Sequence, residues 1–160
     1  MVQKKELIVY FSWSGNTESV AKEIEKQTGA DVFRIVPTEA YTDDYDTLLD
    51  IAQKEQQSGA RPAISGSIKN FDSYEIVYLG YPNWWGDMPM ILYSFLDDYN
   101  LSRKTIVPFV TSGGSGFSNT ISTIENMEPN ALVLDGLSLL NSQTDAPHDA
   151  VADWLSGLGL

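Results

Sequence analysis

The residues best suited to chemistry form a short polar stretch near the N-terminus, Ser12-Trp13-Ser14-Gly15-Asn16-Thr17. Five consecutive apolar residues, 7–11, precede it, as in a strand that is buried on both faces. Apolar residues then recur at helical spacing over 20–24, so a helix should begin near Asn16 or Thr17. The first amides of a helix have no intrahelical acceptor, and the helix dipole favours negative charge there. The stretch therefore indicates an anion site.

The polar stretch contains no Lys or Arg, and this narrows the kind of anion site. It has neither the Gly-Lys pair of a nucleoside-triphosphate loop nor the G-x-G-x-x-G pattern of a dinucleotide fold. A phosphate would be bound by backbone amides and by the side chains of Ser12, Ser14, Asn16 and Thr17. A simpler role fits the same residues, with Asn16 capping the helix and Gly15 easing the turn.

Two other unusual turns follow apolar strands later in the chain. Residues 80–86 include Tyr81, Trp84 and Trp85, and aromatic side chains beside a phosphate site suit a ligand that carries a planar ring. Packing in the core is the alternative for these rings. Residues 111–116 have three glycines in four positions, which lets backbone amides approach a ligand, although a flexible turn explains them equally.

Apolar periodicity predicts five strands that alternate with five helices. The strands are expected at residues 7–11, 32–36, 76–79, 105–110 and 131–134. The helices are expected at about residues 16–27, 45–59, 87–99, around 121–124, and 147–158. This alternation predicts one domain over residues 1–160, an open, doubly wound α/β fold whose parallel sheet carries helices on both faces. The three polar or aromatic turns should converge at the carboxyl ends of the first, third and fourth strands. Pro108 should cause a local irregularity, because proline donates no ladder hydrogen bond.

Composition limits the possible partners and the compartment. The net charge of −12 argues against nucleic acid, and no stretch is long and apolar enough to span a membrane. The N-terminus does not look like a signal peptide, and the lack of cysteine excludes disulfides and thiolate metal sites. We expect a cytoplasmic monomer without a metal. Residues 105–160 contain no Lys or Arg, so their acids either serve solubility or steer basic partners.

Three motifs together resemble the cofactor loops of the flavodoxin family. They are Ser-x-Ser-Gly-Asn-Thr after a strand ending in Tyr-Phe, Pro-Asn-Trp-Trp-Gly, and Thr-Ser-Gly-Gly-Ser-Gly. The resemblance extends from about residue 6 to 157 and implies strand order 2-1-3-4-5 and FMN as cofactor. The better-known flavodoxins hold the flavin between a Trp and a Tyr from separate loops. Here the aromatics cluster in one turn with only Phe117 by the other, so the stacking arrangement stays open. The contact set that the resemblance implies is Ser12, Trp13, Ser14, Gly15, Asn16, Thr17, Tyr81, Pro82, Asn83, Trp84, Trp85, Gly86, Thr111, Ser112, Gly113, Gly114, Ser115 and Gly116.

The resemblance also implies electron transfer, in which the flavin does the redox chemistry and no side chain acts as a catalyst. We expect a low-potential one-electron carrier whose redox partner proteins dock transiently on the acidic face. An FMN-dependent NAD(P)H:quinone-type reductase is the alternative, and the lack of cations near the three turns favours the carrier.

Two unrelated classes fit the sequence less well. Ser115, Asp135 and His148 occur in the order of an α/β-hydrolase triad, but G-x-S-x-G fails at Phe117. A phosphate-accepting receiver domain would need an aspartate where the third strand runs into Tyr81.

Overall fold

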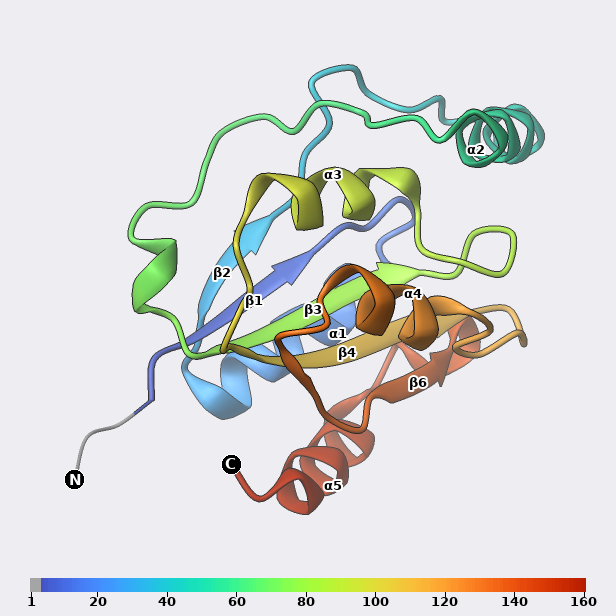
Figure 1. The fold of residues 1–160 in the computed structure, drawn as a ribbon. Helices are drawn as coiled ribbons and strands as arrows, with labels where there is room; N and C mark the ends of the chain where they lie inside the picture. The colour runs from blue at the N-terminus through green and yellow to red at the C-terminus, as the bar shows by residue number, and fades with distance from the viewer. Residues whose placement is uncertain (1–3) are drawn as a thin grey trace.

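Six strands and five α-helices alternate along residues 4–160, the part of the chain that the computed structural model describes (Figure 1). The strands are β1 (Glu6–Tyr10), β2 (Asp31–Arg34), β3 (Ile76–Pro82), β4 (Thr105–Ser112), β5 (Leu132–Val133) and β6 (Leu137–Leu140). The helices are α1 (Asn16–Thr28), α2 (Tyr45–Ser58), α3 (Met90–Asp98), α4 (Thr120–Met127) and α5 (His148–Leu158). Two 3₁₀ turns, Phe71–Ser73 and Asn141–Gln143, lie between them.

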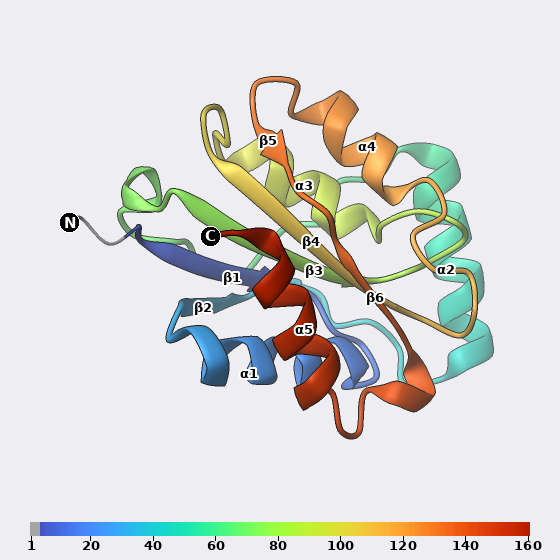
Figure 2. The same ribbon diagram turned by 90° about the horizontal axis from the view of Figure 1, so that it is seen from below.

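All strand pairs are parallel, in the order β2-β1-β3-β4-β5, with β6 also paired to β4. This confirms the predicted order. Helices α1 and α5 cover one face, towards the viewer in Figure 2, and α3 and α4 cover the other. The side chains of β1 alternate between these faces: Ile8 and Tyr10 pack with α1 and α5, and Leu7 and Val9 pack with α3. Both faces of β1 are therefore buried, which explains its unbroken apolar sequence.

The predicted fifth strand, 131–134, is wrong in extent: β5 covers only Leu132–Val133, and a separate strand, β6, follows at Leu137–Leu140 and was not anticipated. Pro108 accounts for the break. The Leu134 amide donates to the Ile106 carbonyl (3.0 Å), so the backbone groups of Ile106 point towards the neighbouring strand. Those of Pro108, two residues later, point the same way. Because proline has no N–H, β4 cannot donate the next ladder hydrogen bond there. A Cβ at Gly136 would lie only 2.7 Å from the Pro108 carbonyl oxygen, so the chain passes very close there. The irregularity predicted at Pro108 therefore appears in the pairing with the next strand, while β4 itself runs without interruption from Thr105 to Ser112.

Strands β3 and β4 run further than expected, to Pro82 and Ser112. Gly80 and Tyr81, predicted in a turn, therefore belong to β3. A Cβ at Gly80 would lie 2.1 Å from the Phe109 ring, so glycine lets β3 and β4 pack closely there. The longer strands carry their last residues to the sheet edge where the predicted turns converge. No helix among residues 4–160 has the length and apolar character needed to cross a bilayer.

Candidate functional site

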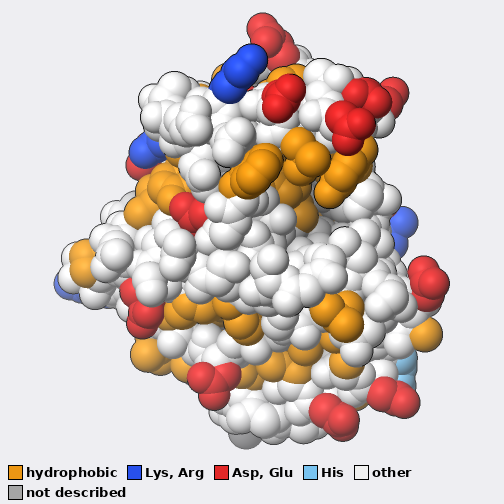
Figure 3. Space-filling view, turned by 90° about the vertical axis from the view of Figure 1, so that its right-hand side faces the viewer, with side chains coloured by type: hydrophobic (Ala, Val, Ile, Leu, Met, Phe, Trp, Pro, Cys, Tyr) orange, Lys and Arg blue, Asp and Glu red, His pale blue; other side chains and the backbone are white. Residues whose placement is uncertain are grey.

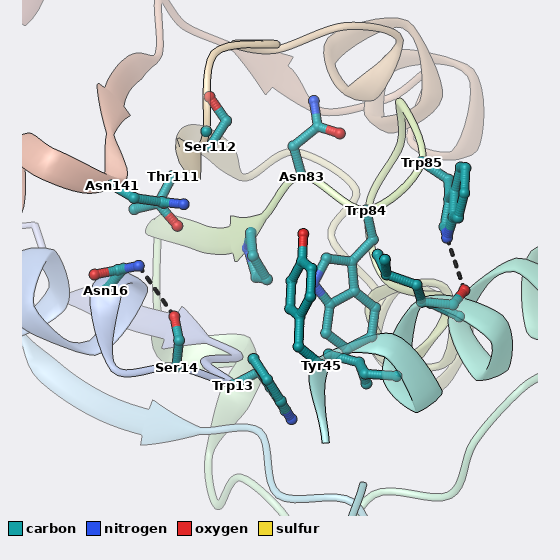
Figure 4. Close-up of a pocket in the computed structure, with 15 residues that line it drawn as sticks. Trp13, Ser14, Asn16, Tyr45, Asn83, Trp84, Trp85, Thr111, Ser112 and Asn141 are labelled. Atoms are coloured by element: carbon teal, nitrogen blue, oxygen red, sulfur yellow. Dashed lines mark hydrogen bonds between the residues drawn. The ribbon is translucent and has the colours of Figure 1, made fainter. Parts of the chain in front are cut away.

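A pocket of about 360 Å³ lies at the carboxyl ends of β3 and β4, on the side of the molecule shown in Figure 3. This volume falls within the range of small-molecule sites. Polar groups gather at one end of the pocket and aromatic rings at the other (Figure 4). The lining residues are Trp13, Ser14, Asn16, Tyr45, Leu48, Leu49, Ala52, Pro82, Asn83, Trp84, Trp85, Thr111, Ser112, Gly113 and Asn141.

The polar end is built on the loop between β1 and α1. The Ser12 hydroxyl accepts hydrogen bonds from the amides of Gly15 (3.2 Å) and Glu18 (3.1 Å), which fixes the loop against the first turn of α1. Gly15 occupies the N-cap position with φ 95°, a left-handed conformation that glycine adopts without strain. Asn16 therefore does not cap the helix. Its side-chain amide instead donates to the Ser14 hydroxyl (3.0 Å), inside the pocket.

Behind the polar end, Thr17 and Arg34 tie the loop to the sheet. The hydroxyls of Thr17 and Thr111 are 2.9 Å apart, and each residue is 1% exposed. Arg34 donates to the Ser12 carbonyl (3.3 Å) and to the Glu18 carboxylate (2.6 Å). Arg34 thus lies outside the pocket lining and is paired with an acid, so it contributes little net positive charge to the pocket.

The aromatic end is centred on Trp84, which lies edge-to-face against Phe11 and Tyr41, with both ring centroids 5.4 Å away. Trp13 and Tyr45 form a second, tilted pair at 6.2 Å, and the Trp13 indole donates to the Thr42 carbonyl (2.9 Å). Figure 4 shows Trp13, Tyr45 and Trp84 gathered on one side of the pocket. Edge-to-face contacts fix ring orientation, so Trp84 presents a defined surface.

The turn that carries Trp85 is hydrogen-bonded to the glycine-rich turn, residues 111–116, and to helix α2. Asn83 accepts from the Gly86 amide (3.0 Å) and donates to the Gly116 carbonyl (2.8 Å), which joins the aromatic turn to the glycine-rich turn. Trp85 has φ 56°, and its indole donates to the Leu49 carbonyl of α2 (2.9 Å). These contacts hold a strained residue against α2.

No Asp, Glu, Lys, Arg or His occurs among the pocket-lining residues of the described chain. A titratable pair lies behind Trp84: Tyr41 packs against this ring, and its hydroxyl donates to the Glu55 carboxylate (2.8 Å). Burial raises the pKa of Tyr41 well above its usual range, and the bond to Glu55 adds to this. Burial also raises the pKa of Glu55, against the opposing effect of the Tyr41 bond. Ligand recognition inside the pocket therefore depends on neutral groups and on the dipole of α1.

The structure brings ten of the eighteen predicted site residues to the pocket wall. Tyr81 is fully buried in the core instead, and burial raises its pKa. Ser12 and Thr17 hold the loop from behind. The others outside the lining are Gly15, Gly86, Gly114, Ser115 and Gly116.

Sequence reasoning missed five lining residues: Tyr45, Leu48, Leu49 and Ala52 on α2, and Asn141. The apolar stripe of α2 was recognised, but a stripe that faces a pocket has the same spacing as one that faces the core. Asn141 follows β6, which was itself missed.

Residues 5–158 match the sequence profile of a protein family that is described as "Flavodoxin". No curated protein sequence matches the chain. Among solved structures, a candidate flavoprotein from Bacteroides eggerthii shares 30% identity, with 99% of each chain covered and a TM-score of 0.87. A flavoprotein from Lactobacillus acidophilus, solved in complex with FMN, shares 24% identity over 94% of this chain and 99% of its own, with a TM-score of 0.76. The Fusobacterium nucleatum flavodoxin bound to flavin mononucleotide shares 14% identity over 98% of each chain, with a TM-score of 0.61.

Proposed function

This chain belongs to the flavodoxin family, and on that basis we propose that it binds FMN in the pocket and carries single electrons between redox partner proteins. The observation that supports this best is the arrangement of the pocket, with neutral hydrogen-bond groups beside a helix N-terminus at one end and aromatic rings at the other. FMN has the matching arrangement, a phosphate at one end and a planar ring system at the other.

The polar residues would hold the phosphate and the hydroxylated chain of FMN. Ser14, Asn16 and the first amides of α1 offer donors to the phosphate, while Thr111 and Ser112 at the end of β4 offer hydroxyls further along the wall. Trp13, Tyr45 and Trp84 would cover the ring and exclude water from it.

Bound FMN supplies the redox chemistry, accepting and returning electrons one at a time. The chain sets how readily electrons are accepted. No positive side chain lines the described pocket, and the protein carries a net charge of −12, so negative charge added to the pocket is opposed. Each ~1.4 kcal/mol of such opposition lowers a one-electron potential by about 59 mV. The pocket therefore favours a low-potential donor.

The surface beside the pocket, over α2 and not over the acids of residues 105–160, is where we propose that a basic partner docks. Acidic side chains gather over α2, near exposed apolar side chains at the pocket rim (Figure 3). Tyr45 and Trp85 are 61% and 48% exposed, and both line the pocket. Exposed rings at the rim would shorten the path for an electron, and the acids would orient a basic partner.

Redox titration of the FMN-loaded protein tests the proposal. We expect two resolved one-electron steps, the second well below that of free FMN, and no turnover of NADPH with a quinone. A sample that stays colourless with excess FMN contradicts the cofactor. Steady NADPH:quinone turnover contradicts the carrier role and supports the reductase alternative.

The docking surface is tested by electron transfer from a basic donor protein at low ionic strength. Replacing Asp46 and Asp50 of α2 with Asn should slow the transfer and weaken its salt dependence. Asp153→Asn on α5, which covers the opposite side of the sheet, is the matched control and should leave the rate near that of the unmodified protein. Equal rates for all variants would contradict docking over α2.

A further inference from the structure

The connection between β6 and α5 closes the polar end of the pocket, although none of the three predicted turns includes it. Its 3₁₀ turn, Asn141–Gln143, places Asn141 in the pocket wall. The next residue, Thr144, is 1% exposed. Most buried hydroxyls have a hydrogen-bond partner, and the partners of Thr144 show what its hydroxyl does.

Thr144 binds the first turn of α1 at two points. Its hydroxyl donates to the side-chain oxygen of Asn16 (2.9 Å), and its carbonyl accepts from the Ser19 hydroxyl. Asn16 and Ser19 are three residues apart and therefore lie on one face of the helix. Two bonds to one face fix the 141–144 connection against the helix N-terminus.

The partners of the Thr144 hydroxyl determine the direction of its hydrogen bond. It lies 2.9 Å from the Asn16 side-chain oxygen and 3.0 Å from the Asn141 carbonyl oxygen, and both of these groups are acceptors. In the structure the hydroxyl donates to the Asn16 oxygen, which therefore faces Thr144, and the Asn141 carbonyl is a second acceptor for the same proton. The Asn16 amide nitrogen then lies on the side of Ser14, as Figure 4 shows, and donates to the Ser14 hydroxyl (3.0 Å).

The orientation of Asn16 matters because no positive side chain lines the described pocket. A phosphate must then be bound by neutral N–H and O–H donors, and a carbonyl oxygen facing it would repel it. We propose that Thr144 is a positioning residue for phosphate recognition, whose hydroxyl holds the Asn16 amide with its N–H groups, and not its oxygen, on the pocket side. This inference rests on the proposed function, in which the pocket binds FMN.

The experiment compares the dissociation constants of FMN and riboflavin, since riboflavin lacks only the phosphate. We expect Thr144→Val to weaken FMN binding about tenfold and riboflavin binding less than about twofold. Thr144→Ser keeps the hydroxyl and should restore FMN affinity. Thr120→Val is the matched control: Thr120 is also fully buried, its hydroxyl has no hydrogen-bond partner, and it lies outside the pocket lining.

A double-mutant cycle separates positioning from a general loss of structure. If Thr144 acts through Asn16, Asn16→Ala should cause the same FMN-specific loss, and adding Thr144→Val to it should cause little further change. Equal losses of FMN and riboflavin affinity in Thr144→Val, or additive losses in the double variant, would overturn the inference. If Thr144→Val does not fold, an Asn16→Ala variant with an unchanged FMN:riboflavin ratio overturns it.

The two proposals fail in different ways. Unmodified protein that binds neither FMN nor riboflavin contradicts the proposed function itself. Unmodified protein that binds both equally retains the flavin site but contradicts a role of Asn16 and Thr144 in phosphate recognition.

Discussion

The two ends of the pocket are held in place by different physical means. At the polar end, hydrogen bonds from buried threonines hold the wall in place: Thr17 to Thr111 in the core, and Thr144 to the half-buried Asn16. At the aromatic end, rings pack edge-to-face around Trp84, while Trp85 remains 48% exposed. Hydrogen bonds define positions more narrowly than ring packing does. The polar end is therefore defined mainly by directional hydrogen bonds, and the aromatic end mainly by ring packing with an exposed ring at its rim.

The two ends also differ in charge. The polar end has no titratable side chain in its lining, whereas the aromatic end rests on the Tyr41–Glu55 pair. Affinity for the phosphate should thus respond to added charge at the polar end, and stability should respond to pH through the aromatic end.

The largest expected effect comes from adding a charge at the polar end. Asn16→Asp places a carboxylate beside the FMN phosphate, where two unit charges about 4 Å apart repel by roughly 4 kcal/mol at an effective dielectric constant of 20. The FMN dissociation constant, measured by flavin fluorescence, should rise by about 100-fold or more, and that of riboflavin much less. Asn100→Asp makes the same charge change at an exposed position after α3 and should alter neither constant. A parallel loss of riboflavin binding would argue that Asn16 does not face the phosphate.

Removing the central ring of the aromatic end should act on both stability and binding. Trp84→Ala loses the contacts with Phe11 and Tyr41, and we expect the free energy of unfolding in urea to fall by about 3 kcal/mol. FMN and riboflavin should lose affinity equally, because both carry the ring. Trp154→Ala removes a tryptophan that packs on Tyr78 and Phe109 across the sheet; it should destabilise the fold without changing flavin affinity. Loss of FMN binding alone in Trp84→Ala would contradict the division of the pocket into two ends.

The backbone strain at the aromatic end predicts a smaller effect on the free energy of unfolding. Glycine and alanine variants should rank in opposite orders at Trp85 and at Tyr45. At Trp85, with φ 56°, Trp85→Gly should be more stable than Trp85→Ala by about 1 kcal/mol, since glycine accepts this conformation freely. At Tyr45, in the first turn of α2, the order should reverse, because alanine is the better helix former. Urea unfolding of the four variants measures both differences. The same order at both positions would show that Trp85 is not strained.

The smallest expected effect is a dependence on pH. Because burial raises the pKa of Glu55, the folded protein holds this proton more tightly than the unfolded chain does. The resulting stability is fully present below pH 4.5 and is lost as pH rises through the raised pKa. Between pH 4.5 and neutrality, the free energy of unfolding should therefore fall less in Glu55→Gln than in the unmodified protein. Glu25→Gln removes an exposed carboxylate from α1 and is the control. An unchanged pH profile in Glu55→Gln would mean that Glu55 is not effectively buried.

The fold was predicted well from the sequence where a local residue pattern is compatible with only one kind of secondary structure. The buried apolar strands and the disturbance of the sheet at Pro108 were found in this way. β6 was missed partly because two of its four partner residues in β4, Thr111 and Ser112, were assigned to a turn. Tyr81 could have been placed better: Val77, Leu79 and Tyr81 follow the two-residue period of a strand and share one buried face.

The site could be predicted only where its residues are close in sequence. The loop before α1 and the tryptophan turn were identified from local chemistry, and the structure places both in the pocket wall. The bond from Thr144 to Asn16 joins residues 128 positions apart, and no local pattern marks such a pair. The part played by α2 was hidden for a similar reason, because which neighbour its apolar stripe meets depends on the complete fold.

The break at Pro108 has a consequence for the free edge of the sheet. An uninterrupted apolar strand there would offer a row of unpaired amides and carbonyls to another molecule, and intermolecular β-pairing of this kind leads to aggregation. Strands of two and four residues, separated at Gly136, make a poor template although Leu132 and Leu140 are exposed on them. We therefore expect the break beside Pro108 to disfavour self-association through this edge, at the cost of ladder hydrogen bonds within the sheet.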